Sequence, residues 1–183
     1  MRNKLTILLA IFVITMVAVS GCTDKDATGG EETVELTVID MVTLKEIPAG
    51  FEFLGARDIL VSDVQAEYAN VSGVVGAADG IYRNGDDKVE IHIVAIECAD
   101  ADAAEELVVQ YKSSFTPLAR GDRFVEQSFN GHFATRILDY TTVDSEQVER
   151  YSYVWSNNSI VFDVSGGTSD ATLTRSFAEA TGF

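Results

Sequence analysis

Short runs in which apolar and polar residues alternate recur along the chain, and turn-forming residues separate them. Alternation with a period of two is typical of strands that bury one face. Asn and Gly tolerate the positive φ angles of tight hairpins, so we predict an antiparallel strand pair around each of three breaks, at 84–87, 130–131 and 157–158. The expected strands are 80–83 with 88–93, 124–129 with 132–138, and 151–155 with 160–164. We also expect a turn at 144–146 and an earlier strand near 51–54.

Apolar residues with helical spacing predict a helix over 100–115. One stripe there recurs at intervals of three and four residues, at Ala104, Leu107, Val108, Tyr111 and Phe115. Asp100 or Asp102 is placed to cap this helix, and Pro117 follows its end.

A second helix is expected to begin at 168–170, with Thr168 or Ser169 as its cap. It is expected to bury Leu173, Phe177 and Ala180. A weaker, short helix is expected at 62–69. Together these elements predict an α+β fold with one domain, in which an antiparallel sheet of hairpins carries two main helices packed on one face.

The N-terminus has the pattern of an export signal. Arg2 and Lys4 precede an apolar run over 5–19, which is shorter than the roughly 20 residues of a comfortable membrane span. The sequence Val19-Ser20-Gly21-Cys22 follows and resembles a lipobox. This resemblance implies that the Cys22 thiol carries a lipid and that cleavage makes Cys22 the first residue. An uncleaved membrane anchor and an ordinary secretory signal are the alternatives.

On this interpretation the chain has three parts: a signal peptide at 1–21, a lipidated flexible tether at 22–33 and a single α+β domain at 34–183. The polar, glycine-containing run after Cys22 favours a tether. The whole chain has 13 Lys and Arg residues, 29 Asp and Glu residues, and a net charge of −16. Loss of 1–21 removes Arg2 and Lys4, which changes the net charge to −18. Such a chain repels nucleic acid, so we expect no nucleic-acid partner.

Motifs of common catalytic and metal sites are missing from the sequence. No Cys-x-x-Cys pair occurs, and Cys98, which ends an apolar run, is expected to be a buried small residue. Asp79, Asp86 and Asp87 flank one hairpin without the spacing of a calcium loop. We therefore expect no metal and no cofactor.

Two histidines, His92 and His132, are the candidates for acid–base chemistry. His92 shares a strand face with Glu90, which could form an imidazole–carboxylate pair. The alternative, which we favour, is that both rings are polar strand residues without a catalytic partner.

Three aromatic residues form a candidate ligand-binding face, because Tyr151, Tyr153 and Trp155 alternate along one strand. The alternative, which we favour, is that they form the core beneath a helix. Asn70 and Asn157 begin glycosylation sequons, and both fit loops of an exported protein.

Two wider resemblances accompany these patterns. The order of strands and helices resembles small α+β export domains of the PsbP/Mog1 type. The chain, including 122–126 (Asp-Arg-Phe-Val-Glu) and 129–132 (Phe-Asn-Gly-His), also resembles small lipoproteins of methanogenic archaea. The latter resemblance implies a location and no particular mechanism.

From these observations we expect a lipid-anchored, extracytoplasmic protein with a binding or envelope-accessory role and no catalytic activity. Its expected partners are the membrane, through lipid on Cys22, and an unidentified protein or small molecule. The alternative is a small extracytoplasmic enzyme that uses His92 or His132 with a nearby carboxylate.

The first testable prediction concerns Cys22. Cys22→Ser removes the thiol that the lipobox resemblance assigns to the lipid, so the variant should leave the membrane fraction. Mass spectrometry of the wild-type N-terminus should find a lipid-modified chain that begins at residue 22. A mature chain that begins elsewhere and carries no lipid would contradict the interpretation.

Overall fold

The computed structural model describes residues 36–86 and 89–183. The predictions for 1–35, which include the signal peptide, Cys22 and the tether, lie outside these residues. The described residues belong to one compact unit. Within the described part of the chain, no helix is both long enough and apolar enough to cross a membrane.

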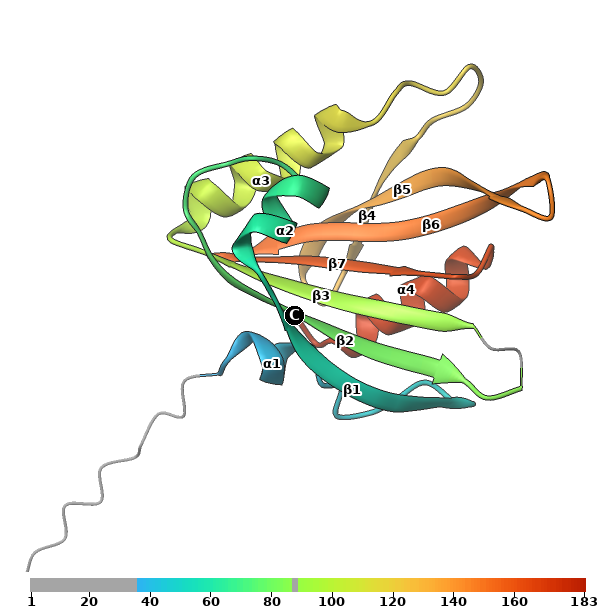
Figure 1. Ribbon diagram of the computed structural model, residues 1–183, viewed down its shortest axis with the longest axis horizontal. Coiled ribbons are helices and arrows are strands. Elements are labelled where there is room, and N and C mark those ends of the chain that lie inside the picture. The colour runs from blue at the N-terminus through green and yellow to red at the C-terminus, as the bar shows by residue number, and fades with distance from the viewer. Residues whose placement is uncertain (1–35, 87–88) are drawn as a thin grey trace, which may run out of the picture. The chain divides into compact units, whose positions relative to one another are not determined.

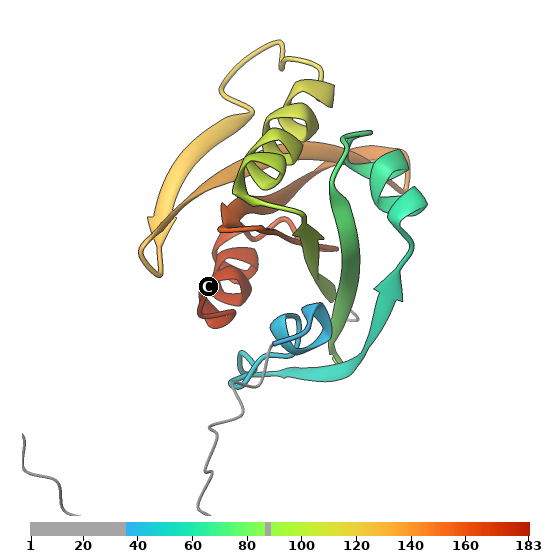
Figure 2. The same ribbon diagram turned by 90° about the vertical axis from the view of Figure 1, so that its left-hand side faces the viewer.

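Seven antiparallel strands form a single sheet in the order β1-β2-β3-β7-β6-β5-β4 (Figure 1). The strands are β1 (Phe51–Ile59), β2 (Val74–Asn84), β3 (Glu90–Cys98), β4 (Phe124–Phe129), β5 (His132–Val143), β6 (Glu146–Asn157) and β7 (Ile160–Gly166). The helices of the described residues are α1 (Val38–Met41), α2 (Val61–Glu67), α3 (Ala101–Ser114) and α4 (Ala171–Ala180). The antiparallel sheet with packed helices confirms the fold class in outline. Figure 2 shows its twist from the side.

The turn residues explain the hairpins. Asn130 and Gly131, between β4 and β5, have φ angles of 52° and 82°. Asp144 and Ser145, between β5 and β6, have φ angles of 50° and 70°. Two successive positive φ angles are those of a type I′ turn, whose twist matches that of the flanking strands. The expected hairpins and the turn at 144–146 are therefore confirmed.

Helices cover both faces of the sheet, so the prediction of two main helices on one face is wrong. Phe177 and Ala178 of α4 pack in one apolar cluster, together with residues after α1, whereas Ala104 and Leu107 of α3 pack in another, together with α2. Alternate residues of β3 divide between the two clusters, with Ile93 in the first and Ile96 in the second. A strand with two covered faces reads as an almost continuous apolar run, as β3 does.

The face under α1 and α4 holds the aromatic core. Tyr82 links the chain after α1 to the sheet, because its hydroxyl donates to the Val42 carbonyl at 2.7 Å and accepts from the Leu44 N–H at 2.7 Å. Gly80 lies beside this contact, and a Cβ there would overlap the Val42 carbonyl. The lack of a side chain at Gly80 thus lets α1 approach the sheet closely.

Aspartates cap the two long helices. Asp100 accepts from the Ala103 N–H at 2.8 Å and begins α3, as expected. Asp170 accepts from the N–H groups of Thr172 and Leu173 and begins α4. Asp170 therefore takes the capping role that we expected of Thr168 or Ser169. A carboxylate at this position satisfies free N–H groups and also faces the positive end of the helix dipole.

The stripe of α3 yields the second prediction. Leu107 is 0% exposed against the sheet, whereas Val109 on the same helix is 62% exposed. Leu107→Ala should lower the free energy of unfolding by about 2–5 kcal/mol, since it removes buried methyl groups and leaves a cavity. Val109→Ala is the matched control and should change it by less than about 0.5 kcal/mol. Urea denaturation measures both, and equal effects would contradict the assigned faces.

Candidate functional site

Polar side chains interrupt the sheet face that α2 and α3 cover. Strand pairing places Asp79 of β2 and Asp163 of β7 on either side of Val94 of β3. Two residues along each strand from the pair of Val94 and Asp163, His92 of β3 lies opposite Ser165 of β7. Side chains two residues apart on a strand share a face. Two carboxyls, an imidazole and a hydroxyl are therefore gathered on the three central strands.

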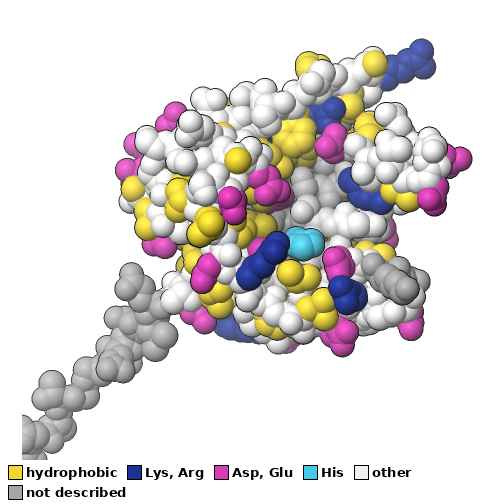
Figure 3. Space-filling view, in the orientation of Figure 1, with side chains coloured by type: hydrophobic (Ala, Val, Ile, Leu, Met, Phe, Trp, Pro, Cys, Tyr) yellow, Lys and Arg dark blue, Asp and Glu magenta, His cyan; other side chains and the backbone are white. Residues whose placement is uncertain are grey.

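Two adjacent pockets open over these residues and share Glu67 and Ser165 in their linings. We call the two together the groove. The larger, of about 420 Å³, also has Arg57, Tyr68, Asp79 and His92 in its lining. The smaller, of about 180 Å³, also has Tyr111, Phe115, Asp139, Arg150 and Asp163. Figure 3 shows this face of the molecule hollowed at its centre, with basic, acidic and histidine side chains around the hollow.

Asp79 holds two basic groups in the larger pocket. Its carboxylate accepts from Arg57 at 2.9 Å and lies 3.0 Å from Nδ1 of His92. Burial raises the pKa of Asp79, but the hydrogen bonds and charges of His92 and Arg57 outweigh burial and leave that pKa below its usual value. The hydrogen bond to Asp79 raises the pKa of His92 despite partial burial. Asp79 thus fixes the ring by Nδ1, and Nε2 is the other nitrogen available for a ligand.

Asp163 has a buried side-chain oxygen without a hydrogen-bond partner in the described structure. Only 4% of the residue is exposed. Its Oδ2 accepts from the Tyr68 hydroxyl at 3.1 Å, while its Oδ1 is buried and has no hydrogen-bond partner among the described residues. Burial raises the pKa of Asp163 to about 7, and the Tyr68 hydrogen bond only partly opposes this. Burial, followed by the charge of Asp163, raises the pKa of Tyr68, so Tyr68 stays a donor.

Aromatic rings at the C-terminal ends of α2 and α3 lie beside Asp163. The Tyr68 and Tyr111 rings are 4.7 Å apart between centroids, and Tyr111 meets Phe115 edge-on at 5.0 Å. Burial, followed by the charge of Asp163, raises the pKa of Tyr111. At the far side of the smaller pocket, Asp139 pairs with Arg123 at 2.9 Å. The smaller pocket therefore combines neutral aromatic side chains with a carboxyl of which one oxygen, Oδ1, has no donor among the described residues.

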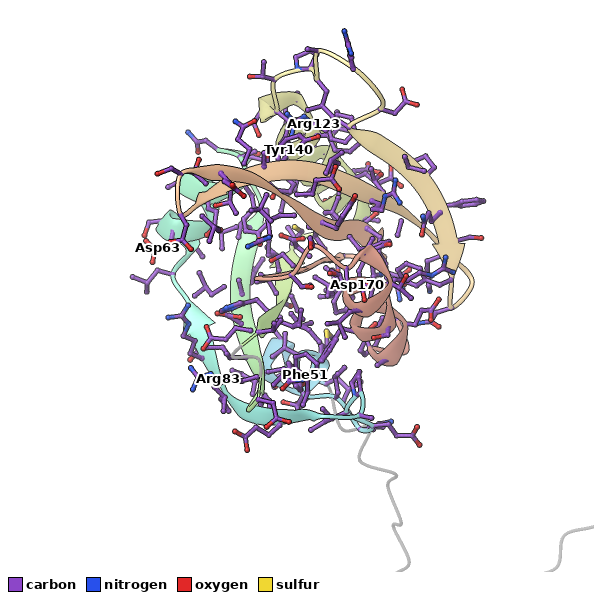
Figure 4. All side chains as sticks on the ribbon, turned by 90° about the vertical axis from the view of Figure 1, so that its right-hand side faces the viewer. Phe51, Asp63, Arg83, Arg123, Tyr140 and Asp170 are labelled. Carbon is purple, nitrogen blue, oxygen red and sulfur yellow. The ribbon has the colours of Figure 1, made fainter. Side chains whose placement is uncertain are left out.

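The histidines lie on different faces. Glu90, the partner expected for His92, pairs instead with Arg83, and Asp79 takes its place at the ring. His132 is on the face of β5 that carries Ala134, which packs in the cluster with α4. His132 therefore lies on the face opposite the groove. Figure 4 shows Asp63 of α2 and Asp170 at the start of α4 on either side of the strands.

The aromatic strand residues do not form an open face. Tyr153 and Trp155 are each 1% exposed and pack in the cluster with α4. Tyr151 is half-buried, and the Arg136 guanidinium lies 5.3 Å from its ring centroid. This stripe is thus placed in and beside the core, which was the alternative that we favoured.

The other candidate residues have simple positions. Asn70 is exposed in the loop after α2, and Asn157 is half-buried at the end of β6, so glycosylation at either position stays a prediction. Cys98 is buried as expected, and burial raises the pKa of its thiol. Within the described ranges, no group of three or more His, Cys, Asp and Glu residues could hold a metal ion.

Sequence reasoning missed Asp163, Asp79 and Tyr68 as site residues. One signal was present: Asp163 is the single charged residue in the apolar run 160–164. A charge at the centre of a buried strand is rarely there without a partner or a function. The pairing of Asp79 with His92 had no local signal, because 13 residues separate them.

Comparisons with known proteins assign no family. No protein-family model matches the chain, and no curated protein matches its sequence significantly.

The third prediction concerns the pH dependence of stability. The folded pKa of Asp163, about 7, exceeds the ordinary value of 3.8, so Asp163 contributes stability that is complete below pH 4 and lost as the pH rises through 7. Asp163→Asn does not titrate and keeps the shape of the side chain. Relative to wild type, the variant should gain roughly 2–3 kcal/mol of stability between pH 5 and pH 8. Urea denaturation at the two pH values measures the change, and a difference independent of pH would contradict it.

Proposed function

We propose that this protein is held at the outer face of a membrane by lipid on Cys22 and binds a small polar molecule in the groove without changing it. The observation that carries the proposal is the buried Oδ1 of Asp163, which lacks a hydrogen-bond partner in the described structure and belongs to a residue of the groove wall. An unsatisfied buried polar atom costs about 1–3 kcal/mol, and a donor from a ligand would remove this cost.

Pocket size and location support the same proposal. The larger pocket, at about 420 Å³, lies within the range of small-molecule sites. The N-terminal pattern that ends at Cys22 favours export and anchoring, and the acidic charge argues against a nucleic-acid ligand. On this interpretation the 12 residues 22–33 tether the binding domain to the membrane.

The fourth prediction tests the groove as the binding site. Ser165 lines both pockets, so Ser165→Trp should fill the space between them. A small-molecule extract of the native cells or their medium should raise the melting temperature of the wild-type protein. It should not raise that of Ser165→Trp. Val109→Trp is the matched control, since it adds the same ring at an exposed position of α3, and it should respond like wild type.

A catalytic role is the second candidate, and one observation favours it. Asp79 orients His92 from one side, and Ser165 lies opposite His92 on the next strand. Acid, imidazole and hydroxyl in this order resemble the arrangement in which a base activates a nucleophile. No hydrogen bond joins Ser165 to His92 in the described structure, and we therefore favour binding. His132 takes no part in this candidate because it lies on the other face.

The two candidates differ in the fate of the bound compound. After incubation, the compound that stabilises the wild-type protein is recovered and its mass is compared with that of the material supplied. An unchanged mass supports binding. A hydrolysed compound that forms with the wild type but not with His92→Gln or Ser165→Ala would replace the binding proposal with the enzyme.

A further inference from the structure

We propose that the smaller pocket of the groove binds the ammonium group of a small protonated amine, with Asp163 as its counter-ion and hydrogen-bond acceptor and Tyr111 beside its apolar substituent. This inference rests on the proposed function, because it names the class of molecule that the groove takes. It concerns a positively charged organic molecule that carries at least one N–H group.

The need for an N–H group follows from the state of Asp163. Its Oδ2 already accepts from Tyr68 at 3.1 Å, and its buried Oδ1 accepts from no described residue. A carboxylate in a largely buried site is stabilised by a partner that is both charged and a donor. A protonated amine supplies both, whereas an alcohol supplies only the donor and a quaternary ammonium only the charge.

The surrounding charges favour a cation. Six carboxyl side chains of the described residues line the groove: Asp58, Asp63, Glu67, Asp79, Asp139 and Asp163. Two arginines line it as well, Arg57 and Arg150. Arg57 is held by Asp79 at 2.9 Å, and Arg150 donates to the Glu149 carbonyl at 2.9 Å. The excess of acidic groups attracts a cation into a site from which water is partly excluded.

The lining also selects an organic cation over a metal ion. Tyr111 and Phe115 present aromatic rings to the smaller pocket, and the faces of such rings attract ammonium groups and alkyl chains. In the described part of the chain, no cluster of three or more metal-ligating acidic, histidine or cysteine side chains exists. The carboxyls of the smaller pocket, Glu67, Asp139 and Asp163, do not converge in such a cluster, and a hard metal ion needs several converging oxygens.

Binding should depend on pH because Asp163 must lose its proton to act as the counter-ion. The titratable groups that face Asp163 are Glu67 of α2, Tyr68 directly after it, Tyr111 of α3 and His92 of β3. Both tyrosines have raised pKa values and stay neutral, and the loss of charge on His92 at higher pH also favours a cation. For a pKa of about 7, the ionised fraction of Asp163 rises about 30-fold between pH 5.5 and 8.

The experiment titrates the full mature chain with n-propylammonium chloride and follows binding by NMR. Three other probes serve as controls. 1-Propanol is a neutral molecule of similar size, and tetramethylammonium is a cation without an N–H group. Potassium chloride at equal ionic strength tests binding of a metal cation. We expect saturable n-propylammonium binding at pH 8, at least tenfold tighter than that of the other three probes. We expect it to weaken about 30-fold at pH 5.5.

Variants test the assigned residues. Asp163→Asn should weaken n-propylammonium binding at least tenfold at pH 8 and should remove most of the pH dependence, leaving only the contribution of His92. Tyr111→Leu should weaken binding several-fold, whereas Tyr111→Phe, which keeps the ring, should stay within twofold of wild type. Glu105→Gln is the matched control, because it removes one negative charge from an exposed position of α3. It should also stay within twofold, and circular dichroism confirms that each variant folds.

The outcomes separate the inference from the proposed function. Equal binding of 1-propanol or potassium, or unchanged binding by Asp163→Asn, overturns the amine inference. If n-propylammonium fails to bind while the extract still stabilises wild type and not Ser165→Trp, the amine inference falls and the binding function stands. If the extract has no effect and n-propylammonium does not bind, both are overturned.

Discussion

The antiparallel pairing of β3 with β7 is the contact on which both the core and the groove depend. It runs from Ile91 opposite Gly166 to Glu97 opposite Ile160 and joins the β1-β2-β3 half of the sheet to the β4–β7 half. Its register places Asp163 beside Val94 on the face under α2 and α3. A slip of one residue would turn Asp163 into the aromatic core on the other face. That core is apolar and buried, so the cost of placing a carboxyl there stabilises the observed register.

One row of neighbours crosses the whole sheet through this pairing and carries five polar side chains of the face. In strand order the row is Arg57, Asp79, Val94, Asp163, Val154, Thr135 and Glu126. At one end Asp79 is satisfied by Arg57 and His92, and at the other Thr135 is satisfied by Lys112 and Glu126. Asp163, at the centre, has Tyr68 as its single hydrogen-bond donor among the described residues. The shortage of donors is therefore confined to the middle of the row, where the groove is open.

Helix length explains why the groove exists. α2 has 7 residues and is about 10 Å long, while β2 beneath it has 11 residues and is roughly 37 Å long. α2 and α3 cover the apolar end of the central strands, where Ile96 and Val161 are buried. Beyond the helices the same strands carry Asp79, His92 and Ser165, which need no apolar cover. Apolar burial thus stabilises one end of this face, and the other end is left accessible to a ligand.

Local patterns in the sequence determined the strands, the hairpin turns and the long helices, because alternation, Asn-Gly turns and helical stripes act over a few residues. They also indicated that Leu107 and Cys98 are buried. The pairing of distant strands decided two further features. It determined which helices cover which face of the sheet, and it placed Asp79 rather than Glu90 at the ring of His92. Asp163 stood out in the sequence as one charge in an apolar run. Only the tertiary structure shows that Tyr68 donates to its Oδ2 while its Oδ1 has no donor among the described residues. Cross-strand register and helix docking decide such contacts, and both arise from the packing of segments far apart in the chain rather than from local sequence.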